Sequence, residues 1–493
     1  MVRDKSCLVR LICHLLGVLS IALCAIAVSP AAAQAGTVDW SFPGQIGSPD
    51  RFTASPRLLE DKGGVLHAFW VENPMTERDA GETEAVMYSR WNGAEWLAPR
   101  DILVAPSGYA IADLSVAVGP DNAIHLVMID SSGGGALYHT VVPADEAGVP
   151  QAWSPMAALA SETVSSASLI AAGERLILLY SDRQPPFEAR VIWSDDGGNT
   201  WSDSILLSPN VAFDEAVVDV SIAFGPDGGL HAAWASYSYP EGYPPTRIEY
   251  SSSSDGGLTW RPPVLIVEGQ YGFPNVTVSS SGTVYIAYNG AAAIRGRYMA
   301  MSPDGGENWD TPVRIAPEIG GLTGNDVAID SAGTLHWVSS SHQGGINGIA
   351  YARSSDGRQW TTPEKIAGKL STIIDDDRGG YEPVIMATEG NRLHVLYIQG
   401  GHVGIEYVTG RSSAPHVAPP GFEAPVRVTL DDDEPTVAVE VAPAQEPTPL
   451  PVGQFDRASP TRNAFPLSTV LWISLLPSLL FLAALIALRR RPR

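Results

Sequence analysis

The residue types best suited to holding a ligand in this sequence are arginines and tyrosines in its longest irregular segments. A guanidinium can donate two parallel hydrogen bonds to a carboxylate, and a tyrosine ring can stack on the face of a sugar. The predicted ligand-binding set is Arg183, Tyr243, Arg247, Arg297, Arg378 and Tyr381. Each of them alone is more simply a solvated loop residue, so the hypothesis requires a fold that brings them to one face.

Charge and cysteine usage limit the partners of the chain. Its 54 acidic residues outnumber 31 basic ones, for a formal charge of −23. Such a surface repels phosphate backbones, so no nucleic-acid partner is expected. The three cysteines, Cys7, Cys13 and Cys24, all lie near the N-terminus. Once that segment is removed, no disulfide or cysteine metal site can form, and we predict no metal and no cofactor.

One turn motif recurs along the middle of the chain. It reads Ser-Asp-Asp-Gly-Gly-Asn-Thr-Trp at 194–201, with equivalents at 253–260 and 302–309 and a shorter version at 354–360. An aspartate in such a turn accepts backbone N–H groups, glycine permits positive φ, and the tryptophan packs beneath. The interpretation is structural for Asp196, Trp201, Asp255, Trp260, Asp304, Trp309, Asp356 and Trp360.

A second signature keeps step with the first. It ends at positions 67, 125, 177, 231, 285, 336 and 394, and five of these seven are histidine. Apolar runs on both sides of a tight turn predict a hairpin, and each unit is expected to hold four short strands, for example 219–224, 230–235, 247–252 and 260–266. One histidine per unit at equal radius cannot converge on a metal, so these side chains are expected to pack inside.

The two ends of the repeat region predict how it closes. Residues 382–410 supply three strands with no following tryptophan, whereas 37–46, with Trp40, resembles an isolated fourth strand. We therefore expect an all-β, seven-bladed β-propeller over 36–410, in which the N-terminal strand completes the last blade and hides both sheet edges. Strand parity puts the long, irregular connections, and with them the arginines and tyrosines above, on one face.

The repeated turns resemble the Asp-boxes (BNR repeats) of the sialidase, or neuraminidase, superfamily, and the likeness covers about residues 37–410. Sialidases hold a substrate carboxylate with three arginines and use a tyrosine nucleophile. Their first arginine usually stands in an Arg-Ile-Pro motif, but here Arg57 follows Pro56 out of phase. No catalytic residue is carried over, and a seventh blade also departs from the six-bladed sialidase ring.

The termini predict where the protein resides. Residues 1–35 combine basic residues, an apolar stretch and small residues, as a cleaved signal peptide does. Residues 411–466 are proline-rich and acidic, which is typical of an extended, disordered linker. The uncharged segment 467–488 is long enough to span a bilayer, and the basic tail 489–493 predicts a cytoplasmic C-terminus. A processed sorting signal with the same layout remains an alternative.

These predictions combine into a single-pass cell-membrane protein whose extracellular propeller recognises a glycan or protein without catalysis. Two alternatives stay open: an exo-acting glycoside hydrolase of sialidase type, and a structural subunit of a cell-envelope complex. Convergent arginines beside a tyrosine and a glutamate would favour the hydrolase. A large flat apolar patch on the loop-rich face would favour the structural subunit.

Overall fold

The computed structural model describes residues 37–49, 51–73, 83–131, 135–160, 164–182, 187–208, 214–239, 244–291, 294–320, 324–341, 346, 348–368, 382–400 and 404–418. The chain divides into two units, Met1–Ala424 and Pro425–Arg493, and all described residues belong to the first. The predicted signal peptide, the linker beyond residue 418, the transmembrane segment and the basic tail lie outside the described residues. Within the described part, no helix has the length and apolarity needed to cross a membrane.

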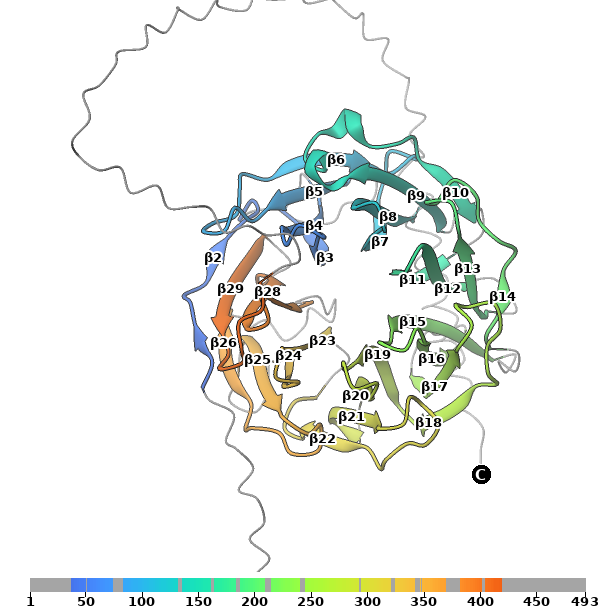
Figure 1. The fold of residues 1–493 in the computed structure, drawn as a ribbon, viewed down its shortest axis with the longest axis vertical. Coiled ribbons are helices and arrows are strands. Elements are labelled where there is room, and N and C mark those ends of the chain that lie inside the picture. Colours follow the sequence, from blue (N-terminus) through green and yellow to red (C-terminus); the bar gives the residue numbers. More distant parts are fainter. Residues whose placement is uncertain are drawn as a thin grey trace, which may run out of the picture. The chain divides into compact units, whose positions relative to one another are not determined.

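Seven antiparallel sheets are arranged in a ring around a central channel (Figure 1). Blades 1 to 3 are β3 (Thr53–Glu60), β4 (Leu66–Glu72), β5 (Ala85–Arg90), β6 (Arg100–Val104); β7 (Ile111–Val118), β8 (Ala123–Asp130), β9 (Ala136–Pro143), β10 (Ala157–Ala160); and β11 (Val164–Ala172), β12 (Arg175–Asp182), β13 (Ala189–Ser194), β14 (Ile205–Leu206). Blades 4 to 6 are β15 (Glu215–Phe224), β16 (Leu230–Ser238), β17 (Pro245–Ser253), β18 (Val264–Glu268); β19 (Tyr271–Val278), β20 (Val284–Gly290), β21 (Gly296–Ser302), β22 (Val313–Ala316); and β23 (Asn325–Ile329), β24 (Leu335–Ser341), β25 (Gly348–Ser354), β26 (Glu364–Ala367).

The last blade contains both ends of the ring. Its strands are β27 (Val384–Thr388), β28 (Arg392–Ile398) and β29 (Ile405–Arg411), with β1 (Asp39–Trp40) and β2 (Gly44–Gln45) paired to β29. The N-terminal segment therefore closes the C-terminal blade, as predicted, but in two pieces. Pro43 lies between them, and proline has no N–H to donate to a ladder. The innermost strand of each blade lies beside that of the next, and β27 lies beside β3.

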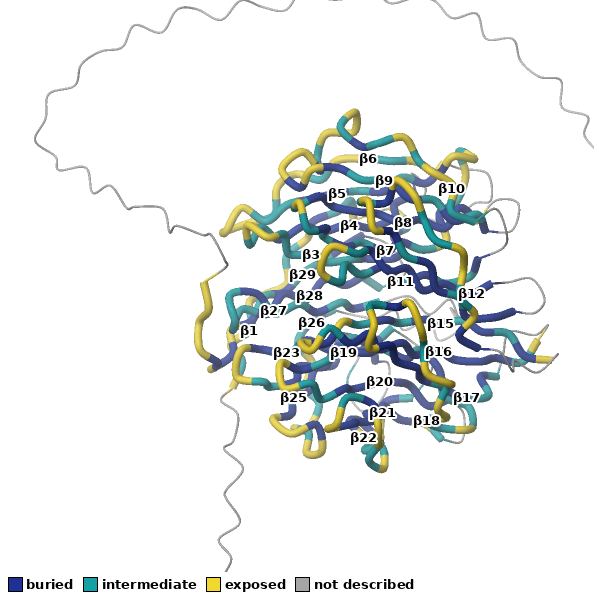
Figure 2. The backbone as a smooth tube through the Cα atoms, turned by 45° about the vertical axis from the view of Figure 1, so that its right-hand side comes forward, coloured by how far each residue is buried: buried dark blue, intermediate teal, exposed yellow. Residues whose placement is uncertain are grey.

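Burial explains why the second strands of the blades are rich in apolar residues. Strands β4, β8, β20 and β24 are buried along their whole length, because neighbouring blades cover both of their faces. Figure 2 shows these strands in dark blue and the exposed residues mostly in the turns. The predicted internal role of the histidines agrees with this packing: His67, His231 and His336 are buried and each contacts a tyrosine hydroxyl at 2.6–2.8 Å.

The strand boundaries of blade 4 differ from prediction. The first three strands are longer than expected, and the outer strand begins at Val264 rather than at Trp260, because Pro262 and Pro263 cannot donate to the ladder. In blade 2, where the sequence has no Asp motif, the third and fourth strands are joined through two 3₁₀ turns, η2 (Ala144–Glu146) and η3 (Pro150–Ala152). Trp153 still packs there and donates from Nε1 to the carbonyl of Ala147 at 3.0 Å.

The chain also stays on the propeller beyond residue 410. Ser412 Oγ donates to Asp330, Asn391 Nδ2 donates to the carbonyl of Ala414, and Val417 N donates to the carbonyl of Glu389 at 2.8–3.0 Å. The first eight residues of the predicted 411–466 linker are therefore part of the folded unit and connect blades 6 and 7.

Candidate functional site

A cavity of about 440 Å³ lies at one mouth of the central channel and is lined by all seven innermost strands. Its walls repeat with the blades. Twelve positions before the end of each repeat signature stand Ser55, Asp113, Ser165, Asp219, Phe273, Gly324 and Glu382. Ten positions before it stand Arg57, Ser115, Ala167, Ser221, Asn275, Asp326 and Val384. We call these sets the outer ring and the inner ring.

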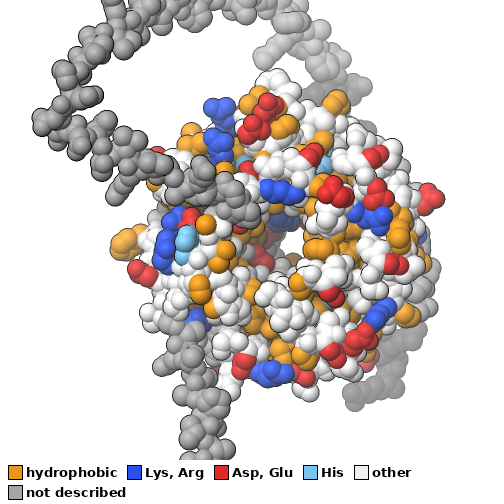
Figure 3. All heavy atoms as spheres, viewed as in Figure 1, with side chains coloured by type: hydrophobic (Ala, Val, Ile, Leu, Met, Phe, Trp, Pro, Cys, Tyr) orange, Lys and Arg blue, Asp and Glu red, His pale blue; other side chains and the backbone are white. Residues whose placement is uncertain are grey.

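The rings lie on the loop-rich side of the propeller. Their residues are at the beginning of each first strand, where the irregular connection from the preceding blade enters. Figure 3 shows, in a space-filling view, that the channel opens at the centre of the ring of blades. The cavity therefore lies on the face of the propeller where strand parity predicted a ligand site.

Backbone irregularities turn the outer-ring side chains into the mouth. The pairing of first and second strands skips residues in blades 1 to 5, as a β-bulge does. Ser55, Asp219 and Phe273 hold the same place in their bulges and have φ of 50°, 52° and 56°. Positive φ is costly for residues other than glycine, above all for a bulky one such as phenylalanine, and such strain clusters at functional sites.

Polar side chains of both rings, and Ser166 between them, link each blade to the next. Where a β-bulge leaves a backbone N–H group without a partner in its own sheet, a side chain of the neighbouring blade accepts the missing hydrogen bond. The links join Glu382 to Ser55, Arg57 to Leu114, Ser115 to Leu169, Ser166 to Val220, Asp219 to Phe273, Asn275 to Asp326, and Asp326 to Ile385. Part of the polarity of this cavity is therefore structural, because these links go once around the ring.

Acidic side chains outnumber basic ones in the described lining of the cavity. They are Asp113, Asp219, Asp326 and Glu382, against Arg57. The Arg57 guanidinium donates from Nε to the carbonyl of Leu114 at 2.7 Å, from Nη1 to that of Pro56 at 2.8 Å, and from Nη2 to Asp113 at 2.5 Å. All three of its nitrogens are engaged in the wall, so the only cation of the described lining is already neutralised.

Two of these carboxyls have a raised pKa. Burial raises the pKa of Asp219, and its hydrogen bonds from Tyr237 Oη at 2.7 Å and Phe273 N at 3.4 Å offset this only in part. Burial also raises the pKa of Asp326, against hydrogen bonds from Ile385 N and Val327 N. A carboxyl whose neutral form is favoured can donate as well as accept a hydrogen bond, and it is also the form that a general acid requires.

Of the six predicted arginines and tyrosines, the structure describes two, Arg247 and Arg297, and neither lines this cavity. Arg183, Tyr243, Arg378 and Tyr381 lie outside the described residues. Arg247 donates to Glu215 and, at 3.2 Å, contacts Glu249; these carboxylates outweigh the effect of burial and hold its pKa above the usual value. Arg297 is fully buried between blades 5 and 6, donates to Ser339 Oγ at 3.0 Å, and burial lowers its pKa to about 9.

The repeated Asp turns do not form a ligand site either. Asp255 accepts from Ser253 Oγ at 2.8 Å, Thr259 N at 2.9 Å and Thr259 Oγ1 at 2.6 Å, and hydrogen bonds from Thr259 lower its pKa to about 2. Gly256 and Gly257 have φ of 70° and 89°, which the turn requires. Asp196, Asp304 and Asp356 accept equivalent bonds, and Trp201, Trp260 and Trp360 donate to a turn carbonyl at 3.1–3.2 Å, whereas Trp309 packs on Tyr250.

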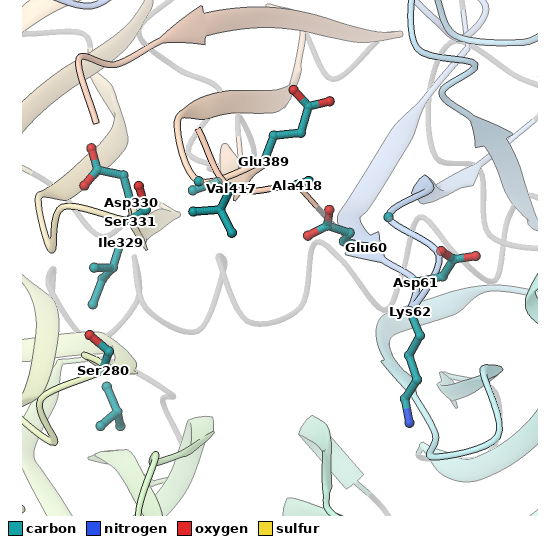
Figure 4. Close-up of a pocket in the computed structure, with 14 residues that line it drawn as sticks. Glu60, Asp61, Lys62, Ser280, Ile329, Asp330, Ser331, Glu389, Val417 and Ala418 are labelled. Atoms are coloured by element: carbon teal, nitrogen blue, oxygen red, sulfur yellow. The ribbon is translucent and has the colours of Figure 1, made fainter. Parts of the chain in front are cut away.

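A second cavity, of about 740 Å³, lies at the opposite mouth of the channel (Figure 4). It is lined by the ends of the innermost strands, including Glu60, Ile329 and Glu389, and by Val417 and Ala418 of the C-terminal segment. Burial, followed by the charges of Asp61 and Glu389, raises the pKa of Glu60 to about 7. Among the described residues, no group of three His, Cys, Asp or Glu is placed to hold a metal ion.

Sequence reasoning missed the two rings, although a signal for them is present. Asp113 and Asp219 both stand twelve positions before a signature histidine, and Asp326 stands ten positions before His336. Counting back from the repeat would have placed all of them on innermost strands. The predicted ligand-binding residues come from loops, whereas most ring residues lie inside the innermost strands.

No family model matches the sequence, and no curated protein matches it. Among solved structures, an ulvan lyase bound to a GlcA(1-4)Rha3S saccharide has a TM-score of 0.52 at 11% identity, over 74% of this chain and 95% of its own. The lectin BP39L from Burkholderia pseudomallei has a TM-score of 0.50 at 15% identity, over 78% and 98%. A Hadza microbial sialidase, Hz136, has a TM-score of 0.45 at 13% identity, over 70% and 76%. The chain is therefore similar in fold to the ulvan lyase and the lectin.

Proposed function

We propose that the protein is an exported, membrane-anchored propeller that binds a glycan at the loop-side mouth of its channel without turning it over. The observation that supports this best is the cavity built by two rings of residues from all seven blades. It combines carboxylate and hydroxyl groups, which bind sugar hydroxyls, with the ring of Phe273, which can stack on a sugar face. The ulvan lyase and the lectin that share the fold are both named for glycans or their recognition, which supports a saccharide as ligand.

Binding to a glycan array tests the proposal. Phe273→Gly removes the stacking ring and relieves the positive φ, so binding is expected to fall at least tenfold while the thermal midpoint changes little. Leu258→Ala is the control, because Leu258 is exposed in an Asp turn on the opposite face. Equal binding by both variants would place the ligand elsewhere.

Hydrolysis is the second candidate, and one observation favours it. Asp219, with its raised pKa and its contact to Tyr237, is suited to donate a proton to a leaving group. We expect no turnover of fluorogenic sialosides or other glycosides by the purified protein. Turnover that Asp219→Asn abolishes would establish the hydrolase instead.

The anchoring part of the proposal rests on residues 467–488 and the arginines after them. Protease treatment of intact cells is expected to release the propeller by cutting between residues 419 and 466. Recovery of the protein from the cytosol would contradict this placement.

A further inference from the structure

The ligand class of the channel mouth can be inferred from its charge. We propose that this site selects saccharides without negative charge and favours those that carry a protonated amino group. This inference rests on the proposed function, because it concerns the same cavity. It reverses the expectation of a sugar carboxylate held by arginines.

The first argument is the balance of charge in the outer ring. Asp113, Asp219 and Glu382 are its acidic members, and among the described residues no lysine or arginine belongs to it. Burial raises the pKa of Asp219, so the negative charge that a ligand carboxylate or sulfate meets in the described lining comes chiefly from Asp113 and Glu382. Like charges at close range repel, whereas an ammonium group is attracted by the same field.

The second argument is the state of the arginines. Arg57 is the one described cation of the lining, and each of its three guanidinium nitrogens already donates a hydrogen bond. Two parallel bonds from Nε and Nη2 to a ligand carboxylate would require Arg57 to release the Leu114 carbonyl of the next blade, because Nε has a single N–H. Arg247 and Arg297 are outside the lining altogether.

The third argument is an acceptor without a donor. Asn325 lines the cavity and is nine-tenths buried, and its Nδ2 donates to the carbonyl of Phe273 at 3.1 Å. Its Oδ1 accepts no hydrogen bond from the described part of the chain. A buried acceptor left unpaired is costly, so this wall favours a ligand that brings donors. Hydroxyl and ammonium groups are donors, and an ionised carboxylate or sulfate is not.

The experiment compares neutral, amino-bearing, carboxylated and sulfated oligosaccharides on one array with the whole protein at low and at physiological salt. We expect binding to the neutral and amino-bearing classes, with the amino-bearing class strongest at low salt and weakened by added NaCl. Asp219→Asn should reduce binding of the amino-bearing class by at most about fivefold, the factor for one fully ionised pair at about 4 Å in water, because burial favours the neutral form of this carboxyl. The neutral class should be nearly unchanged. Asparagine suits the positive φ of this position.

Glu382→Gln is the second variant and should act in the same direction, so the test does not depend on the folding of one mutant. Asp203→Asn removes an exposed carboxylate that does not line the cavity and should have no effect. Preferential binding of carboxylated or sulfated saccharides would overturn the inference while leaving the proposed function intact. Unchanged selectivity in both ring variants would also overturn it. Binding to none of the four classes would reject the proposed function itself.

Discussion

The closure of the ring by the N-terminal segment predicts a specific stability loss. Ile46 follows β2, is 8% exposed, and packs against Trp70 of blade 1 and Leu396 and Ile405 of blade 7. Its backbone N donates to the carbonyl of Ile405 at 2.9 Å. Replacing a buried isoleucine by alanine costs about 2–5 kcal/mol, and this site can relax toward solvent only on one side. We expect Ile46→Ala to lower the free energy of unfolding by about 3 kcal/mol.

The matched control is Phe42→Ala in the same segment. Phe42 is 95% exposed, and substitutions at such positions usually change stability by no more than about 0.5 kcal/mol. Denaturant unfolding followed by tryptophan fluorescence measures both variants, and hydrogen exchange in blade 4 reports whether the loss reaches the far side of the ring. Equal effects of the two substitutions, or a loss confined to blade 7, would refute the view that this segment closes one cooperative ring.

Two further predictions concern single carboxyls. The pKa of Glu60 rises from 4.5 to about 7 on folding, so the folded state binds more protons than the unfolded one between those values. Its contribution is fully present below about pH 4.5 and is lost as pH rises through 7, and Glu60→Gln should flatten that slope in a pH series of denaturation midpoints. Asp255→Ala removes the acceptor of three turn hydrogen bonds, and a loss of about 1 kcal/mol is expected in the same assay. An unchanged pH slope in the first variant, or an unchanged midpoint in the second, would contradict these assignments.

Most of the fold could be predicted because two sequence motifs recur at regular intervals along the chain. The signature before each hairpin and the tryptophan after it fix seven units, and the single tryptophan at position 40 shows that one strand is borrowed from the N-terminus. The exact boundaries of the strands and of the folded unit were harder to predict from the sequence. The late start of β18 depends on two prolines after Trp260, and the attachment of residues 412–418 depends on contacts with Asn391 and Glu389 that lie far from them in sequence.

The candidate site was harder to predict, because its residues share a position but no chemistry. The outer ring contains serine, aspartate, phenylalanine, glycine and glutamate at equivalent places, so no residue pattern marks it. The bulges that turn these side chains toward the mouth are equally hidden. Ser55, Asp219 and Phe273 adopt positive φ without being glycine, which local propensity alone would not predict.

Ionic pairing limits what the described arginines can offer to an anionic ligand. In an acidic chain, an arginine at the edge of a sheet finds a carboxylate of its own fold, as Arg247 does with Glu215 and Arg57 does with Asp113. A partly buried guanidinium held in this way loses the donors that a ligand carboxylate needs. The acidic side chains, by contrast, outnumber the one arginine in the described lining of the channel mouth. In such a protein the excess charge, rather than the rarer one, is the better guide to what the site can bind.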